Sequence, residues 1–274
     1  MVEMFVKDLK KTNLSDNTIA SYKKTVELFF SLYAEITKKN LLGFKGYLLE
    51  NFKPKTVNLR IQGINKYLVF IKKEKFRLSA IKLQQKSFLE NVISDADYNY
   101  FKKQLKKDGN IYWYFVIRYL AATGARISEL VQLKIEHLKI GYYDIYSKGG
   151  KIRRLYIPLK LREESINYYN DIGIDSGFIF RNNKGNRITT RGIAIQLKKL
   201  AVKYGIDPNV VYPHSFRHRF AKNFLEKYND IALLADLMGH DSIETTRIYL
   251  RRTSTEQQAI VDKVIDWWLL IYML

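Results

Sequence analysis

The last quarter of the chain concentrates residue types that could act together on a phosphate. His214 and Arg217 are three positions apart, His240 follows Gly239, and Tyr249 comes shortly after. An arginine fork holds two phosphate oxygens, a histidine moves a proton, and a tyrosine hydroxyl acts as a nucleophile. These residue types are the ones needed to cut DNA through a phosphotyrosine bond.

Two upstream stretches add an arginine and a lysine. Arg126 follows Gly124 at the junction of two apolar helices, where the backbone turns sharply and the side chain can face a cleft. The alternative is an ion pair with Glu129, which we interpret as a structural residue of that turn. Lys148 lies at the tip of a glycine-rich hairpin, from which it could enter a groove and give up a proton. An ordinary surface lysine is the alternative.

Each residue of the cluster also has a structural interpretation. A buried, hydrogen-bonded side chain suits His218, a helix cap suits His240, and a core aromatic suits Tyr249, since the chain has 20 tyrosines. A metal site from His214, His218 and His240 is disfavoured because the glutamate of a zinc protease helix is missing. We expect neither a metal nor a cofactor.

Composition points to a polyanionic partner. The chain of 274 residues has 47 Lys plus Arg against 27 Asp plus Glu, a formal charge of +20, and residues 1–85 carry half of that excess. Such a charge favours binding of double-stranded DNA, although a solubilising surface is the alternative. The absence of cysteine suits a reducing cytoplasm. No signal peptide is recognisable, so a cytoplasmic, nucleoid-associated protein is expected.

The N-terminal residues predict a small helical domain. Apolar residues recur at helical spacing over 18–33, 39–51 and 54–74, with Ser15 or Asp16 as a cap for the first. We expect a helical, DNA-clamping domain over 1–80 and a linker over 81–93. Basic residues lie on the polar sides of these helices. Each of them could equally be an ordinary side chain on a solvated face. Those taken as candidate DNA contacts are Lys23, Lys24, Lys53, Lys55 and Arg60.

The remainder, 94–274, predicts a second domain of mixed structure. Helices fit 96–107, 110–122, 127–134, 161–170, 190–204, 214–228, 230–238 and 242–250. Between them, 142–147 and 153–158 alternate like two strands of a hairpin. The fold class is therefore mainly α with a small β-sheet. Residues near the hairpin that we place on flanking phosphates are Lys151, Arg153 and Arg154.

The C-terminal end is strongly apolar. Residues 267–274 read Trp-Trp-Leu-Leu-Ile-Tyr-Met-Leu, which is too short to span a bilayer. Such a stretch must be buried on its own body, on a neighbouring subunit or at a membrane surface. We favour protein contact through 260–274 and expect no membrane association.

Taken together, the motifs resemble those of tyrosine recombinases of the Xer and phage-integrase type, and the resemblance covers nearly the whole chain. The family motif Thr-Gly-x-Arg-x-x-Glu-Leu is matched by 123–130, and His-x-x-Arg-His by 214–218. A Gly-Lys-Gly-x-Lys hairpin is approximated by 147–151, and Leu-Gly-His by 237–240. Three positions depart from the pattern, without loss of a reactive group: Ser147, Met238 and Arg219, the last of which could add a DNA contact.

The resemblance implies a mechanism residue by residue. Tyr249 would attack a scissile phosphate, leaving a 3'-phosphotyrosine and a 5'-hydroxyl. Arg126, Arg217 and His240 would stabilise the pentacoordinate phosphate in place of a metal. Because an unperturbed tyrosine has a pKa of about 10, His214 is the expected base, and Lys148 the expected acid.

The family resemblance also implies a tetramer on two DNA sites, with the C-terminal segment docked on a neighbouring protomer. Two other functions stay open at this point. A topoisomerase of the same phosphotyrosine class would relax one duplex instead of joining two. A regulator that binds DNA without catalysis predicts a broken site, whereas all six expected positions are filled here.

Overall fold

The computed structural model describes residues 1–83, 91–146, 152–250 and 257–262. The chain divides into two compact units, Met1–Gln85 and Lys86–Leu274. Much of the expected linker, 81–93, and the hairpin tip with Lys148 and Lys151 lie outside the described residues. So does most of the apolar C-terminal segment, of which only 260–262 are described.

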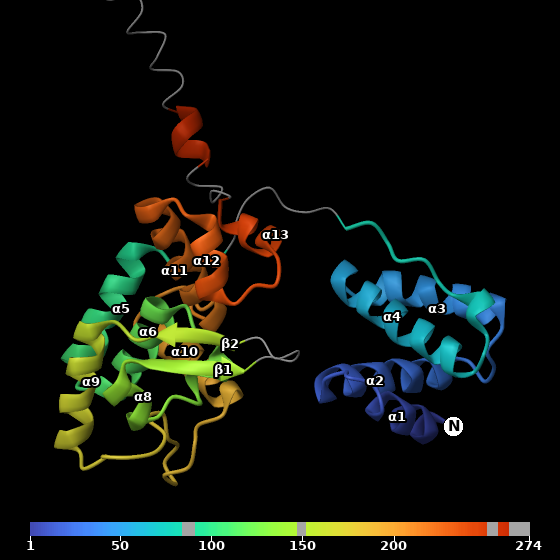
Figure 1. Ribbon diagram of the computed structural model, residues 1–274. Helices are drawn as coiled ribbons and strands as arrows, with labels where there is room; N and C mark the ends of the chain where they lie inside the picture. Colours follow the sequence, from blue (N-terminus) through green and yellow to red (C-terminus); the bar gives the residue numbers. More distant parts are fainter. Residues whose placement is uncertain (84–90, 147–151, 251–256, 263–274) are drawn as a thin grey trace, which may run out of the picture. The chain divides into compact units, whose positions relative to one another are not determined.

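The first unit is a bundle of helices (Figure 1). It comprises α1 (Val2–Lys10), α2 (Asp16–Leu32), α3 (Lys38–Asn51), α4 (Pro54–Phe70) and the short 3-10 helix η1 (Glu74–Phe76). Ser15 caps α2 by accepting the amide of Thr18 at 3.2 Å, as the sequence predicts. Helix α1 was not expected, and its buried Phe5 and Leu9 join the core that α2 and α4 form.

The second unit is mainly helical with one small sheet (Figure 1). Its helices are α5 (Asp95–Lys107), α6 (Ile111–Thr123), α7 (Ile127–Leu130), α8 (Ile135–Ile140), α9 (Leu159–Asp171), α10 (Thr190–Lys203), α11 (Pro213–Tyr228), α12 (Ile231–Met238), α13 (Ile243–Thr246) and the 3-10 helix η2 (Arg247–Leu250). Strands β1 (Tyr142–Tyr146) and β2 (Ile152–Tyr156) pair antiparallel, with Tyr142 opposite Tyr156. The expected fold class, mainly α with a small β-sheet, is confirmed.

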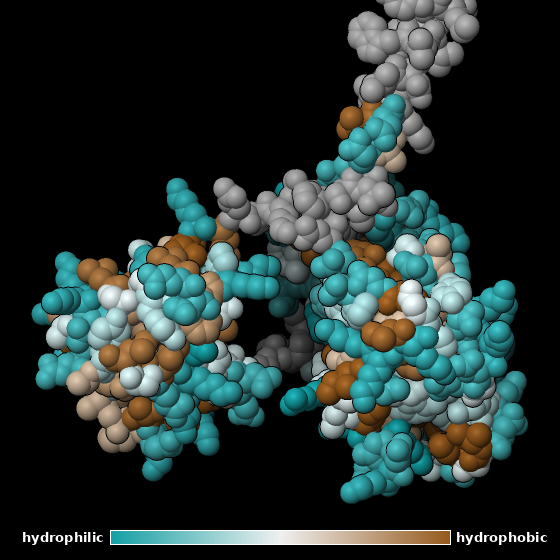
Figure 2. Space-filling model, turned by 180° about the vertical axis from the view of Figure 1, so that it is seen from behind, coloured by the Kyte–Doolittle hydropathy of each residue, from teal (hydrophilic) through white to brown (hydrophobic). Residues whose placement is uncertain are grey.

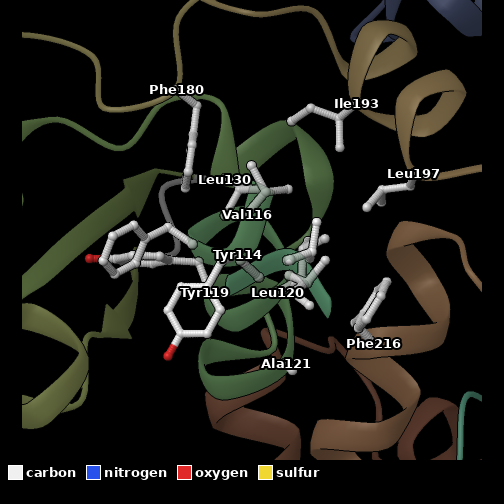
Figure 3. Close-up of a cluster of buried hydrophobic side chains, with 14 of the residues drawn as sticks. Tyr114, Val116, Tyr119, Leu120, Ala121, Leu130, Phe180, Ile193, Leu197 and Phe216 are labelled. Carbon is white, nitrogen blue, oxygen red and sulfur yellow. The ribbon is translucent and has the colours of Figure 1, made fainter. Parts of the chain in front are cut away.

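Helix α6 is the centre of the second unit. Its residues are apolar on nearly every side, and Val116, Ile117, Tyr119 and Leu120 are fully buried. Figure 3 shows this helix beside Ile193 and Leu197 of α10 and Phe216 of α11. A helix enclosed in this way is held on several sides, so its C-terminal end gives a fixed point from which Arg126 projects.

A second, smaller core lies under the C-terminal helices. Ala221 and Leu225 of α11 pack with Leu234 and Met238 of α12 and with Tyr249 of η2. This packing positions the tyrosine beside α11, the helix that also carries His214 and Arg217. The segment 242–250, expected as one helix, forms α13 followed directly by the 3-10 helix η2.

The surface carries its apolar residues in small patches. Figure 2 shows mostly hydrophilic side chains on the visible face of each unit, with hydrophobic ones in separate groups. Among the described residues, no helix is both long and apolar enough to cross a membrane.

Candidate active site

The site is built around the C-terminal end of α12. Three guanidinium groups donate hydrogen bonds to three consecutive carbonyls there, those of residues 237–239. The last carbonyls of a helix lack partners within the helix and carry partial negative charge, so cations are favoured at this end. The donors come from Arg153 of β2, Arg217 of α11 and Arg126 at the junction of α6 and α7.

Arg217 is the most enclosed of the three. Its side chain is 1 % exposed, and its Nη2 atom lies 2.6 Å from the Met238 carbonyl and 3.1 Å from His240 Nε2. Its Nε is buried without a hydrogen-bond partner among the described residues. Burial, together with the nearby charges of Arg126 and Arg153, lowers the pKa of Arg217 to about 10. An anion binding here would meet a charged group with an unused donor.

Arg126 is more open to solvent. Helix α6 ends at Gly124 in the left-handed region (φ 62°), where a Cβ would lie 2.5 Å from the Phe220 ring. The chain then turns into α7, and the Arg126 side chain, 41 % exposed, donates to Glu129 and to the Gly239 carbonyl. The ion pair with Glu129 and an orientation toward the cluster therefore coexist.

Glu129 holds two arginines at once. Its carboxylate accepts from Arg153 Nη1 at 2.7 Å and Arg126 Nη1 at 2.9 Å, and it also caps α7 by accepting the Arg126 amide at 2.7 Å. Burial raises the pKa of this carboxyl, but the two guanidinium groups outweigh it and the net shift is downward. The structural role expected for Glu129 in the turn agrees with this position.

Arg153 is buried, whereas we expected it at the surface. We expected it on a flanking DNA phosphate, yet its side chain is only 8 % exposed and paired with Glu129. Its Nε donates to the Leu237 carbonyl at 2.8 Å, while its Nη2 is buried without a partner among the described residues. A Cβ on Gly239 would approach the Arg153 Cδ to 2.3 Å. Arg153 thus belongs to the interior, and it explains the glycine before His240.

Arg219, another expected DNA contact, is engaged within the protein. The guanidinium lies 2.5 Å from Asp95 and over the Tyr98 ring at 4.1 Å, and the side chain is 14 % exposed. Its partners on α5 leave it little surface to offer a phosphate. Arg154 is also engaged, in a two-pronged contact with Asp144 at 2.8 Å.

The candidate contacts of the first unit fall into two groups. Lys24, Lys53 and Lys55 are exposed. Lys23 pairs with Glu3 at 2.6 Å, and Arg60 is half-buried, with its guanidinium 5.4 Å from the Phe52 ring centre. The three exposed lysines are therefore the better placed of the five for an external anion.

Tyr249 is buried inside the cluster. It is 4 % exposed and lies between two histidines, with ring centres 5.3 Å from His218 and 6.2 Å from His240. Burial raises the pKa of the Tyr249 hydroxyl, whereas the charge of Arg217 and a hydrogen bond to its guanidinium oppose that rise. The hydroxyl is therefore protonated at neutral pH and needs a base to become a nucleophile.

The histidines of α11 differ from one another. His214 is exposed near the start of the helix, and partial desolvation and the charges of Arg217 and Arg126 lower its pKa. His218 lies 4.8 Å from it, ring centre to ring centre, and burial lowers its pKa to about 4. We expected His218 to be hydrogen-bonded, but its Nδ1 is buried without a partner among the described residues.

Within the described ranges, no group of three or more histidine, aspartate or glutamate side chains is placed to hold an ion. His240 contacts Arg217 and Tyr249, and His218 contacts Tyr249 and His214. The structure thus brings together Arg126, His214, Arg217, His240 and Tyr249, while Lys148 lies outside the described residues.

The comparisons with known proteins agree with this geometry. Residues 91–256 match the model of the phage integrase family. The chain belongs to this family. It is 30% identical over 273 residues to the tyrosine recombinase XerA of Pyrococcus furiosus, covering 96% of this chain and 93% of that protein. It is 27% identical to a tyrosine recombinase XerD of Oceanobacillus iheyensis, covering 88% and 89%. The chain is accordingly a tyrosine recombinase of the Xer-like type.

Solved structures share the fold at low identity. A crystal structure of a XerA recombinase matches with a TM-score of 0.55 at 22% identity, covering 96% of both chains. A transposon Tn1549 integrase in complex with transposon end DNA matches with a TM-score of 0.71 at 15% identity, covering 96% of this chain and 99% of that one. Both confirm the expected architecture across nearly the full length.

Acid should destabilise this cluster through its histidines. His218 and His240 both have a pKa near 4 in the folded protein, well below the ordinary value of 6.5, first of all because of burial. Between pH 6.5 and 4 the two histidines are therefore protonated in the unfolded chain but largely neutral in the folded one. The free energy of unfolding consequently falls as the pH drops through this range. The slope for each histidine approaches about 1.4 kcal/mol per pH unit.

Denaturant unfolding of wild type and His218→Phe at pH 7 and pH 5 measures this effect. The phenylalanine keeps a ring in place and cannot titrate, so its loss of stability between the two values should be smaller than that of wild type. An equal loss in both proteins would contradict the assigned pKa.

Proposed function

We propose that this recombinase cuts and rejoins double-stranded DNA through a 3'-phosphotyrosine on Tyr249. One observation supports the proposal above the others, which is the convergence of Tyr249 and His240 on the buried Arg217. This guanidinium has an unpartnered Nε among the described residues, and Arg126 reaches the same helix end. Anion-binding donors thus lie directly beside the nucleophile.

In the proposed reaction, the Tyr249 oxygen attacks the phosphorus and the bond to the 5'-oxygen breaks. His214 accepts the tyrosine proton, and Lys148 donates a proton to the departing 5'-oxygen. Arg126, Arg217 and His240 bind the non-bridging oxygens, whose charge grows in the transition state. The phosphotyrosine keeps the bond energy, so a 5'-hydroxyl from another strand can reverse the step without ATP.

A nicked suicide substrate tests the proposal. When the short 5' fragment diffuses away, religation fails and the covalent protein–DNA product accumulates on a denaturing gel. Wild type should form this adduct, with the protein joined to the 3'-phosphate end of the cut strand. A wild type that binds the duplex and forms no adduct would favour the alternative of a DNA-binding regulator. Relaxation of a supercoiled plasmid without any strand exchange would favour a topoisomerase.

DNA binding by the first unit would rest on its exposed lysines. Lys24, Lys53 and Lys55 are the members of the expected set with open side chains. We propose that they bind phosphates, which positions the duplex without reading its sequence. We further propose that recombination proceeds in a tetramer on two DNA sites, with the segment 260–274 contacting a neighbouring protomer. Its exposed apolar residues Ile260 and Val261 begin the segment.

Removing residues 264–274 should separate binding from assembly. We expect the shortened chain to bind one DNA site with nearly unchanged affinity, because the proposed phosphate contacts lie elsewhere. Tetramers on two sites should be fewer, since the apolar contact between protomers is lost. Native gels and light scattering with DNA measure both properties. Unchanged tetramer formation would contradict the role proposed for the segment.

A further inference from the structure

Both ring nitrogens of His240 have defined partners. Nε2 lies 3.1 Å from Arg217 Nη2, and Nδ1 lies 2.8 Å from the Thr246 hydroxyl oxygen. A guanidinium can only donate hydrogen bonds, so Nε2 must be the acceptor of the first contact. A neutral ring that accepts at Nε2 carries its proton on Nδ1. Nδ1 therefore donates to the hydroxyl of Thr246.

The electrostatics of the cluster favour that neutral ring. Burial lowers the pKa of His240 to about 4, and the charges of Arg217, Arg126 and Arg153 and the nearby His214 add to the effect. At neutral pH the His240 imidazole is thus uncharged. The hydrogen bonds alone then decide which nitrogen bears the proton.

Thr246 is well placed to fix the orientation of His240. It is fully buried, and it is the last residue of α13, three positions before Tyr249 in η2. The His240 and Tyr249 rings lie nearly parallel, 12° apart. One short helical segment therefore carries both the tyrosine and the group that holds the histidine.

We propose that Thr246 is a positioning residue for His240: the Thr246 hydroxyl accepts a hydrogen bond from Nδ1–H and thereby directs Nε2 toward the place where Arg217 would hold a phosphate oxygen. This inference rests on the proposed function. A phosphate in that place would offset the guanidinium charges and let Nε2 take up a proton from solvent, while the proton on Nδ1 stays there and continues to be donated in the hydrogen bond to Thr246. His240 would then donate to the phosphate from the nitrogen that already faces it.

Nitrogen NMR of the free protein tests the contact without any reaction. The chain has four histidines, so ¹⁵N-labelled histidine gives a spectrum simple enough to assign by substitution. Wild type should show His240 protonated on Nδ1. Thr246→Ser should keep that pattern, and Thr246→Val should change the His240 shifts. A proton on Nε2 in wild type, or unchanged shifts in the valine variant, would overturn the inference.

The suicide substrate then measures the consequence for chemistry. Thr246→Val should form the adduct about tenfold more slowly, corresponding to one lost hydrogen bond, and Thr246→Ser should restore the rate. Thr245→Val makes the same change at the exposed neighbouring position and should react like wild type. If wild type forms no adduct, the proposed function fails while the NMR result still reports on Thr246. Adduct formation by Thr246→Val at the wild-type rate would refute the positioning role itself.

Discussion

Tyr249→Phe should abolish the covalent DNA adduct while leaving DNA binding intact. The substitution removes one oxygen, and the ring stays packed against Ala221, Leu225 and Met238 in the small C-terminal core. Because that oxygen is the proposed nucleophile, no other change is needed to reduce adduct formation to the background level. The measurement is a denaturing gel of protein with the nicked suicide substrate, with binding followed on a native gel.

Tyr228, at the end of α11, gives the matched control. Tyr228 is 60 % exposed at the C-terminal end of this helix, outside the small core. Tyr228→Phe makes the same chemical change and should leave adduct formation at the wild-type rate. An adduct of normal yield in Tyr249→Phe would contradict the assignment of the nucleophile.

Arg217→Lys should slow adduct formation by about 10²–10³-fold, the usual effect of losing one preorganised donor for a developing negative charge. Lysine keeps the positive charge but has a single nitrogen, whereas Arg217 contacts the carbonyls of Gly124 and Met238 and the His240 ring. The planar fork, more than the charge, is therefore what the substitution removes.

Stability must be measured beside the rate, because Arg217 is buried. Each carbonyl left unpaired costs about 1–3 kcal/mol, so denaturant unfolding should show a clear loss. Arg219→Lys is the control, since Arg219 lies half a turn away in an ion pair with Asp95 and over the Tyr98 ring. It should lose stability and keep the rate of adduct formation. Equal rates in Arg217→Lys and wild type would refute the role of Arg217.

Mixing the two variants tests which subunit supplies the nucleophile. Tyr249 lies against His240 and hydrogen-bonds to Arg217 of its own chain, which supports attack on a phosphate held by the same subunit. A mixture of Tyr249→Phe and Arg217→Lys should then be no more active than the sum of its parts. Restored activity would show that one subunit donates its tyrosine to another.

The fold was largely predictable because most helices bury one side. The spacing over 54–74 anticipated α4, and Ser94 caps α5 by accepting the Asp97 amide at 3.0 Å, as its sequence position indicates. The signal for the missed helix α1 was present, since Val2, Phe5, Val6 and Leu9 recur at helical spacing, but it extends over only nine residues. The helical spacing over 242–250 did not show that the segment changes from the α-helix α13 to the 3-10 helix η2 at Arg247.

The residues that form the site were predictable from the sequence, but the contacts that hold them in place were less so. The signal for Arg153 was present, since it alternates with Leu155 and Ile157, and both of those are buried. That alternation places its side chain inward, although its charge favoured the surface. Arg219 offered no such signal, because its partner Asp95 lies on a helix far away in the chain. The contact between Thr246 and His240 likewise depends on how the chain folds between α12 and α13, which the spacing of residues alone does not show.

The position of the covalent bond tests the account most directly. Trypsin cuts after Arg247 and Arg251, so the adduct with the suicide substrate, once digested with nuclease, should yield the peptide Ile-Tyr-Leu-Arg with a nucleotide on its tyrosine. Tandem mass spectrometry locates that nucleotide and shows whether it is joined to the peptide through its 3'-phosphate or its 5'-phosphate. We predict a 3'-linked nucleotide on Tyr249. A nucleotide attached to any other residue would contradict the mechanism.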